Sequence, residues 1–169
     1  LGRISAFAPG TKENAAIFLH GCAFKIYADL IMGYSDKAYQ TLKIILPFNI
    51  DPEIQKSEPY VLPEYRIGKG NFDFGEGAFS WLPGSADWLF RSIIDLMIGV
   101  NPQFDGLSIV PQLPKNIKRV FVKRKFRNNN YEIEINNTKN YKIYFDNKVL
   151  DTNILPILSD NKTHSVKVI

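Results

Sequence analysis

The sequence predicts an α+β chain, with helices in its first part and an antiparallel sheet in its second. Residues 1–103 carry apolar side chains at helical spacing, whereas apolar and polar side chains alternate through much of residues 104–169. The change follows Gly99, a residue type that commonly ends helices. We therefore expect two domains, 1–103 and 104–169.

A first helix is expected over residues 14–32. Within it Lys25 and Asp29 lie four positions apart and form one narrow polar stripe, so the other sides of the helix are enclosed. His20 lies nine residues before Asp29, which places it on the opposite side of the helix, pointing inward. An inward histidine either rests in the core with one hydrogen bond or lines a polar pocket, and both readings stay open.

A second helix is expected over residues 35–46, with Ser35 as its cap and Pro47 as its stop. The short link before it predicts an αα-hairpin. Its apolar face consists of Ala38, Leu42, Ile45 and Leu46.

Residues 47–80 form a long connection rich in proline, glycine and aromatic residues. A connection of this length is typically functional or disordered, and its aromatic content argues against disorder.

Residues 75–99, GEGAFSWLPGSADWLFRSIIDLMIG, combine a glycine-rich turn with a third helix. Charged residues recur every four positions and apolar residues such as Trp88 and Phe90 fill the other sides, which predicts a largely buried helix ended by Gly99. The backbone amides of Gly84 and Ser85 lie at its start, where unpaired donors and the helix dipole favour an anion. Taken alone this signal is weak, because water or a side-chain cap is the ordinary occupant of a helix start.

Strands are expected in the second part, where apolar residues alternate at 131–135, 141–145 and 166–168, separated by asparagine-rich turns. The segment KRVFVKRKFR carries six basic residues in ten. We interpret it as a solvated strand face, because no stacking platform or nucleic-acid motif accompanies it.

Composition narrows the function classes. The 169 residues are 45% hydrophobic, with a net charge of +4 spread along the chain, so neither nucleic acid nor a membrane is expected as a partner. A single cysteine allows no internal disulfide and favours a reducing, cytoplasmic location. Because the sequence starts at Leu1 without an initiator methionine, we expect a processed product, a truncated chain or a piece of a longer protein.

Five ordered blocks carry a family resemblance: PGTKENAAIFLHG, SEPYVLPEY, FGEGAFSWLPGSADWLFR, GVNPQFDGLSIVPQLP and VKRKFRNNNYEIEI. Over residues 3–136 the chain resembles the C-terminal part of glycoside hydrolase family 94. That family contains inverting cellobiose, chitobiose and cellodextrin phosphorylases and the phosphorylase-like part of cyclic β-1,2-glucan synthases. The resemblance implies C-terminal helices of an (α/α)6 catalytic barrel followed by an antiparallel β-sandwich cap.

The resemblance also implies a reaction. Inorganic phosphate, a co-substrate, attacks the anomeric carbon of a β-linked disaccharide or oligosaccharide, while a carboxylic acid protonates the leaving oxygen. The product is an α-sugar 1-phosphate, and no cofactor or metal is implied. Matching the family's phosphate ligands gives His20 and the step Pro83-Gly84, with Ser85 beside it. Family members are generally homodimers, so a homodimer is allowed.

The chain departs from the family pattern at the expected phosphate ligands and at the residues expected to face the sugar. Pro83 replaces a threonine and so removes a hydroxyl and an N–H, which leaves the amides of Gly84 and Ser85. Arg3 and Phe7 stand where relatives tend to have an acid and a tyrosine, which bears on the identity of the acceptor sugar. Lys12 matches the family and is expected to contact that sugar.

The general acid, an aspartate in this family, is expected upstream of Leu1. Glu64, Asp73 and Glu76 lie in the aromatic loop, but such carboxylates more often bind sugar hydroxyls, and Glu76 is our candidate sugar ligand. We therefore expect the isolated chain to be inactive. Two alternatives remain: a non-catalytic carbohydrate-binding or scaffold module, and an (α/α)6-barrel glycoside hydrolase, which needs an inward carboxylate near His20 from Glu64 or Glu76.

Overall fold

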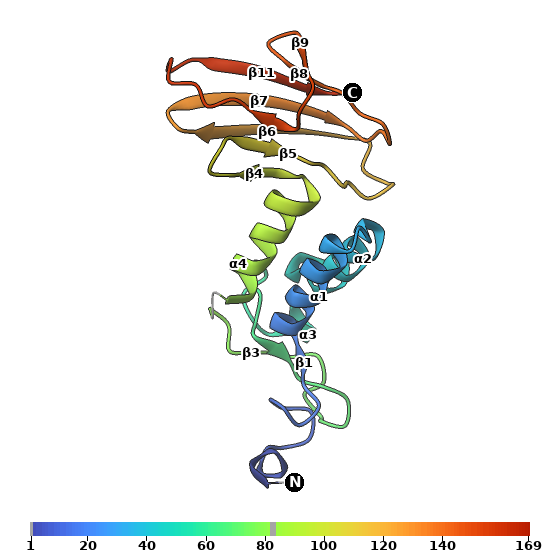
Figure 1. The fold of residues 1–169 in the computed structure, drawn as a ribbon. Coiled ribbons are helices and arrows are strands. Elements are labelled where there is room, and N and C mark those ends of the chain that lie inside the picture. Colours follow the sequence, from blue (N-terminus) through green and yellow to red (C-terminus); the bar gives the residue numbers. More distant parts are fainter. Residues whose placement is uncertain (1, 82–83) are drawn as a thin grey trace. The chain divides into compact units, whose positions relative to one another are not determined.

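The computed structural model describes residues 2–81 and 84–169 and divides the chain into two compact units, an N-terminal unit of residues 1–90 and a C-terminal unit of residues 91–169 (Figure 1). The first contains most of the helices and the second most of the strands, so the expected α+β class is confirmed. Among the described residues, no helix combines the length and apolar character needed to cross a bilayer.

The N-terminal unit consists of short elements around one helical hairpin. Its elements are η1 (Gly2–Ala6), β1 (Ile17–Phe18), α1 (Leu19–Ile31), α2 (Ser35–Ile45), η2 (Pro47–Asn49), α3 (Pro52–Gln55), β2 (Tyr65–Arg66), β3 (Gly77–Ala78) and α4 (Gly84–Arg91), whose last residue begins the second unit.

Helices α1 and α2 form the expected hairpin (Figure 1). The side chains of α1 that face inward are at most 1% exposed and recur at helical spacing, as Leu19, Ala23, Ile26 and Leu30. On the polar side, the Lys25 ammonium contacts Asp29 at 2.5 Å and the Thr41 hydroxyl of α2 at 3.0 Å. The polar stripe that the sequence predicts therefore also links the two helices.

Two helix boundaries differ from expectation. α1 begins at Leu19 rather than near residue 14, because the preceding residues pair with β2 in a small antiparallel sheet ordered β1-β2-β3. The Leu19 amide itself donates to the carbonyl of Glu64 at 2.9 Å. α2 begins with Ser35 as its first helical residue, and the capping position falls on Tyr34, whose side chain makes no capping bond. The expected Ser35 cap is therefore wrong.

The C-terminal unit contains two sheets. Its elements are η3 (Ser92–Met97), β4 (Val100–Pro102), β5 (Leu107–Ile109), β6 (Arg119–Phe126), β7 (Asn129–Asn136), β8 (Ile143–Phe145), β9 (Lys148–Leu150), β10 (Ile154–Leu155) and β11 (Thr163–Val168). One sheet has the order β10-β5-β4 and the other β6-β7-β11-β8-β9.

The larger sheet is mixed rather than purely antiparallel. β11 pairs in parallel with β7, from Thr163 opposite Asn130 to Val168 opposite Ile135, and antiparallel with β8. The prediction of an antiparallel sheet is therefore wrong for this pair. Parallel neighbours need a crossover of a dozen or more residues, and residues 137–162, which hold β8, β9 and β10, supply that length.

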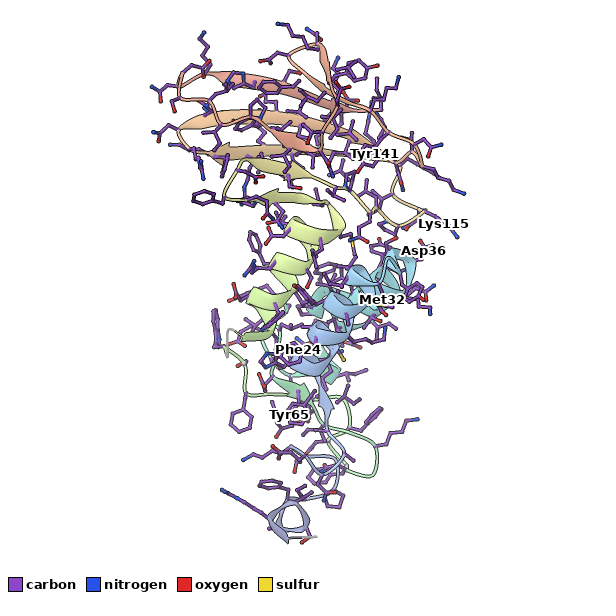
Figure 2. The ribbon with its side chains drawn as sticks, in the orientation of Figure 1. Phe24, Met32, Asp36, Tyr65, Lys115 and Tyr141 are labelled. Carbon is purple, nitrogen blue, oxygen red and sulfur yellow. The ribbon has the colours of Figure 1, made fainter. Side chains whose placement is uncertain are left out.

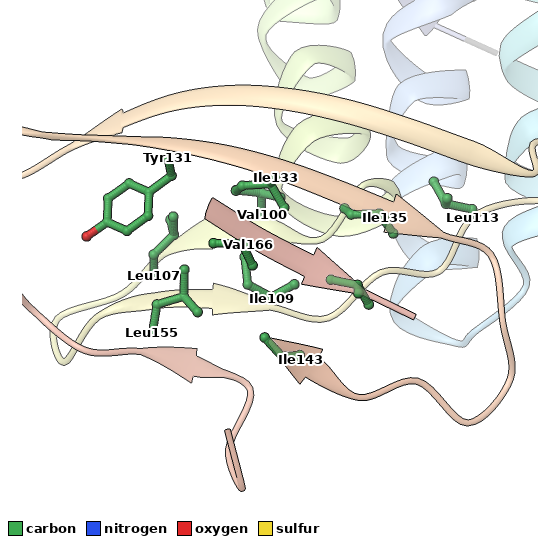
Figure 3. Packing of buried hydrophobic residues seen from close by; sticks show 11 residues of the cluster. Val100, Leu107, Ile109, Leu113, Tyr131, Ile133, Ile135, Ile143, Leu155 and Val166 are labelled. Carbon is green, nitrogen blue, oxygen red and sulfur yellow. The ribbon is translucent and has the colours of Figure 1, made fainter. Parts of the chain in front are cut away.

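The core of the C-terminal unit lies between the inner faces of its two sheets (Figure 3). Alternate residues of β7 point into it, as the sequence pattern predicts, and Ile133 and Ile135 are at most 1% exposed. The cluster comprises Val100, Leu107, Ile109, Leu113, Tyr131, Ile133, Ile135, Ile143, Leu155, Val166 and Val168.

The basic segment lies on β6 and faces solvent on alternate residues. Lys123 and Arg119 pair across the ladder with Glu132 and Glu134 of β7, at 3.1 and 3.4 Å. The solvated strand face expected from the sequence is confirmed.

The helix that begins with α4 changes its winding after Arg91. Residues Ser92–Met97 form a π-helical segment, in which the Ile98 amide donates to the Ile93 carbonyl at 2.8 Å. Gly99 follows with a φ of +74°, and a Cβ there would lie 2.0 Å from the Val110 carbonyl oxygen, so the expected glycine end is confirmed. The helix is less buried than expected, since Phe90 is 59% exposed.

Candidate functional site

Within the N-terminal unit, three segments that are distant in sequence meet around the imidazole of His20. His20 lies in the first turn of α1, and its ring centroid is 4.6 Å from that of Phe24. Figure 2 labels Phe24 on this helix. The Nδ1 atom of His20 lies 3.5 Å from the Glu64 carboxylate, which precedes β2. The start of α4 approaches the same ring at Gly84.

Gly84 matters here because it lacks a side chain. A Cβ at this position would lie 3.1 Å from His20 Cε1, tighter than an ordinary contact. Glycine therefore lets the N-terminus of α4 lie directly against the imidazole. Pro83, the predicted departure from the family pattern, lies outside the described residues.

Two polar atoms around this contact are buried and have no hydrogen-bond partner among the described residues. They are Nε2 of His20 and the Oγ of Ser85, whose residue is fully buried. Buried polar groups normally find partners, so two unpaired ones beside a helix start call for an explanation. The inward orientation expected for His20 holds for Nε2, although the whole side chain is 31% exposed.

Lys12 lines a separate pocket, whose other lining residues are Arg3, Ile4, Phe7 and Glu13. Its ammonium lies 5.0 Å from the ring centroid of Phe7 and 5.4 Å from that of Phe79, in range of cation–π contacts. The backbone of Lys12 is left-handed, with φ +45°. The structure thus brings Lys12 together with Arg3 and Phe7, the two departures noted at the sugar-facing end.

Glu76, the other candidate sugar ligand, pairs with Lys56. The hydrogen bond that the Lys56 ammonium donates to the Glu76 carboxylate raises the pKa of Lys56. The carboxylate of Glu76 thus has a lysine partner, and the carboxylate that reaches His20 belongs to Glu64.

The neighbouring loop holds an exposed tryptophan in a defined orientation. The indole N–H of Trp81 donates to the Glu58 carboxylate at 2.6 Å, and this bond lowers the pKa of Glu58. Phe79 and Trp81 both have positive φ, +52° and +67°, a conformation that is costly for bulky residues and concentrates at functional sites.

The sequence offered Glu64 and Glu76 as carboxylates that could lie near His20, and no sequence pattern distinguished the two. Glu64 lies in an irregular connection, and the bond from the Leu19 amide to its carbonyl and the pairing around β2 bring its carboxylate to His20.

Residues 1–99 match the family model described as the glycosyl hydrolase 94 superfamily, catalytic domain. The chain is 33% identical over 175 residues to a solabiose phosphorylase of Paenibacillus borealis, covering 99% of this chain and 23% of that protein. It is 30% identical over 139 residues to an N,N'-diacetylchitobiose phosphorylase of Vibrio proteolyticus, covering 81% of this chain and 17% of that protein.

A third relative is larger. The cyclic β-(1,2)-glucan synthase NdvB of Rhizobium meliloti (strain 1021) is 30% identical over 118 residues, covering 67% of this chain and 4% of that protein. The chain thus spans less than a quarter of the length of each of these relatives.

Proposed function

The chain belongs to the glycosyl hydrolase 94 superfamily, and from that premise we propose that it is the C-terminal part of an inverting β-glycoside phosphorylase. In this proposal phosphate attacks the anomeric carbon of a β-linked disaccharide or oligosaccharide from the face opposite the leaving sugar, and an α-sugar 1-phosphate forms. The relatives with phosphorylase names support this reaction class.

The observation that carries the proposal is the meeting of His20 with the start of α4. Phosphate oxygens accept hydrogen bonds from the Gly84 and Ser85 amides and from the Ser85 hydroxyl, which otherwise has no partner among the described residues. Nε2 of His20 faces the same ligand. Helix dipole and amides together favour an anion at this position, so the proposal explains both unpaired atoms.

The sugar is assigned to the neighbouring residues. Lys12, in its pocket with Arg3 and Phe7, contacts the acceptor sugar, and Glu76 binds a sugar hydroxyl. The proton for the leaving oxygen comes from an aspartate outside these 169 residues, so the chain by itself does not turn over substrate.

One observation favours a second candidate, an (α/α)6-barrel glycoside hydrolase. That mechanism needs a carboxylate near His20 to act as a base on water, and Glu64 lies 3.5 Å from the ring. The two candidates differ in their dependence on phosphate.

The test is the variant His20→Ala in the full-length protein. A hydrogen bond to a charged group contributes about 1.5–3 kcal/mol, so the KM for phosphate is expected to rise about 10- to 100-fold. Excess phosphate should partly restore the rate. The control Ile31→Ala changes an exposed residue of the same helix and should leave the phosphate KM unchanged. A loss of activity in His20→Ala that excess phosphate does not relieve, or activity without phosphate, would contradict phosphorolysis.

A further inference from the structure

The basic strand β6 lies at one edge of the larger sheet, with β7 as its neighbour on one side. Just before β6, the Asn137 amide donates to the Lys118 carbonyl at 2.8 Å. Hydrogen bonds between antiparallel strands alternate, so every second residue from Lys118 onward directs its backbone groups toward β7. The residues between them direct their N–H and C=O groups away from β7, and these groups have no partner among the described residues. They are Arg119, Phe121, Lys123 and Lys125.

The side chains of the same four residues share the outer face of the sheet, because side chains alternate along a strand. Three of them are cations. The fourth, Phe121, is 66% exposed, and the Arg119 guanidinium lies 4.9 Å from its ring centroid. Lys125 is exposed and forms no ion pair with the described residues. The edge therefore offers free backbone groups and positive charge at the same positions.

A second copy of this chain is a poor occupant of the edge. Pairing of β6 with another β6 would place basic side chains opposite one another, which is destabilising, and charged residues on edge strands are a common means of preventing such self-pairing. The acidic strand β7 already has β6 and β11 as neighbours, so it has no free edge to offer. The strand at the other edge, β9, is three residues long and begins with Lys148.

We propose that β6 is a docking edge for an extended acidic segment of another protein, which adds to the five-stranded sheet as a further strand antiparallel to β6. Backbone bonds to the free groups of β6 supply affinity, and alternate side chains supply specificity. Acidic residues of the segment lie opposite the three cations, and an apolar residue lies opposite Phe121. On its other side β6 already pairs with acidic residues, since Glu132 lies opposite Lys123 at 3.1 Å.

The experiment titrates the 169-residue chain with the capped peptide ETEVYVE, whose glutamates face the three cations and whose tyrosine faces Phe121 when it pairs antiparallel to β6. Hydrogen exchange of backbone amides, followed by NMR, reports the pairing. We expect exchange to slow at Arg119, Phe121, Lys123 and Lys125. The amides between them already bond to β7 and should change little. This alternation is specific to an added strand, because a loose electrostatic contact protects no particular amides.

A peptide of the same composition, EEETVVY, is the first control. It carries the same charge without the alternation, so it should bind about tenfold more weakly. Binding of ETEVYVE should also weaken as the salt concentration rises from about 0.05 to about 0.5 M, since its charges are exposed.

The matched variants change one residue of the edge at a time. Lys125→Glu breaks no ion pair among the described residues and should weaken binding about tenfold, because an attraction becomes a repulsion. The control Lys148→Glu makes the same charge change on β9 and should bind the peptide normally. Phe121→Pro removes one outward N–H and no bond to β7, so it should abolish the protection. If that variant does not fold, Lys125→Glu still decides the question.

The remaining outcomes contradict the proposal. Fast exchange at the four amides in the presence of ETEVYVE, or equal binding of the scrambled peptide, would show that no strand is added. Protection of these amides in the chain alone would assign the edge to a second copy. Protection only in the full-length protein would assign it to the chain's own upstream part. A normal affinity in Lys125→Glu would show that the basic side chains do not select the partner.

Discussion

The two units of the chain differ in how they treat their polar and apolar side chains. In the C-terminal unit, ten buried residues from the strands of two sheets, together with Leu113, form one continuous core. Both units expose some large hydrophobic residues, such as Phe72 at 95% in the N-terminal unit and Phe104 at 94% in the C-terminal unit. The polar atoms differ: four of the five buried side-chain atoms that have no partner among the described residues lie in the N-terminal unit, in His20, Ser57, Arg66 and Ser85.

The residues with left-handed backbone also differ in type. In the N-terminal unit they include the bulky Phe79 and Trp81, whereas the described non-glycine residues of the C-terminal unit with positive φ are polar residues between strands. Such departures from good packing concentrate where a protein binds ligands. The difference therefore supports assigning the chemistry to the N-terminal unit.

The largest effect is expected from Ile133→Ala in the core of the C-terminal unit. Ile133 is 1% exposed, and removing a buried isoleucine side chain costs about 2–5 kcal/mol. The free energy of unfolding, measured by urea titration of the chain, should fall by that amount. A change below about 1 kcal/mol would show that this core is less tightly packed than the burial indicates.

The stability of the C-terminal unit should also depend on pH through His164, which is 5% exposed. Its Nδ1 lies 2.7 Å from Asp146 and its Nε2 3.1 Å from Asp160, which itself lies near Lys162. The hydrogen bond to Asp146, with that to Asp160, raises the pKa of His164 despite its burial. Burial opposes the shift at Asp146, but bonds from His164 and the Ser165 amide lower its pKa overall.

The sign of the pH effect follows from these directions. A raised histidine pKa contributes stability that is complete below the ordinary value of 6.5 and is lost as the pH rises through the folded-state pKa. Lowered aspartate pKa values contribute stability above 3.8 that is lost on acidification. The free energy of unfolding should therefore be greatest between pH 3.8 and pH 6.5. At pH 9 it should be lower by about 1 kcal/mol, and the effect is this small because Asp146 is partly exposed. If the free energy of unfolding does not change with pH in wild type, or if its pH dependence is the same in Asp146→Asn, the proposed contribution of the His164–Asp146 pair is wrong.

The smallest effect is expected from Phe72→Ser in the N-terminal unit. Because Phe72 is almost fully exposed, its replacement should change the free energy of unfolding by less than about 0.5 kcal/mol. The matched variant Phe145→Ser alters a ring packed against Tyr131 and His164 and should cost more. Equal effects of the two variants would contradict the difference in packing between these two rings.

Local patterns predicted much of the fold. The hairpin of α1 and α2, the alternation along β7 and the glycine end at Gly99 follow from spacing within one segment. The small β1-β2-β3 sheet and the parallel pairing of β7 with β11 join segments far apart in sequence, and no local period encodes such pairing.

In the candidate site, too, local patterns predicted some features and long-range contacts determined others. The sequence placed His20 on an inward face, and the family resemblance paired it with Gly84, where the structure places α4 against the ring. The sequence offered Glu64 and Glu76 alike as carboxylates near His20, and the approach of Glu64 to the ring depends on tertiary structure alone. What remained hidden was therefore which of the two is the electrostatic partner of His20.

The most direct test of the central claim is the phosphate requirement of product formation. The full-length protein, supplied with a panel of β-linked disaccharides, should release an α-sugar 1-phosphate only when inorganic phosphate is present, as followed by phosphorus-31 NMR. The 169-residue chain should produce none. Release of free sugar at the same rate with and without phosphate would contradict the account and favour hydrolysis, and turnover by the chain alone would contradict the placement of the acid outside it.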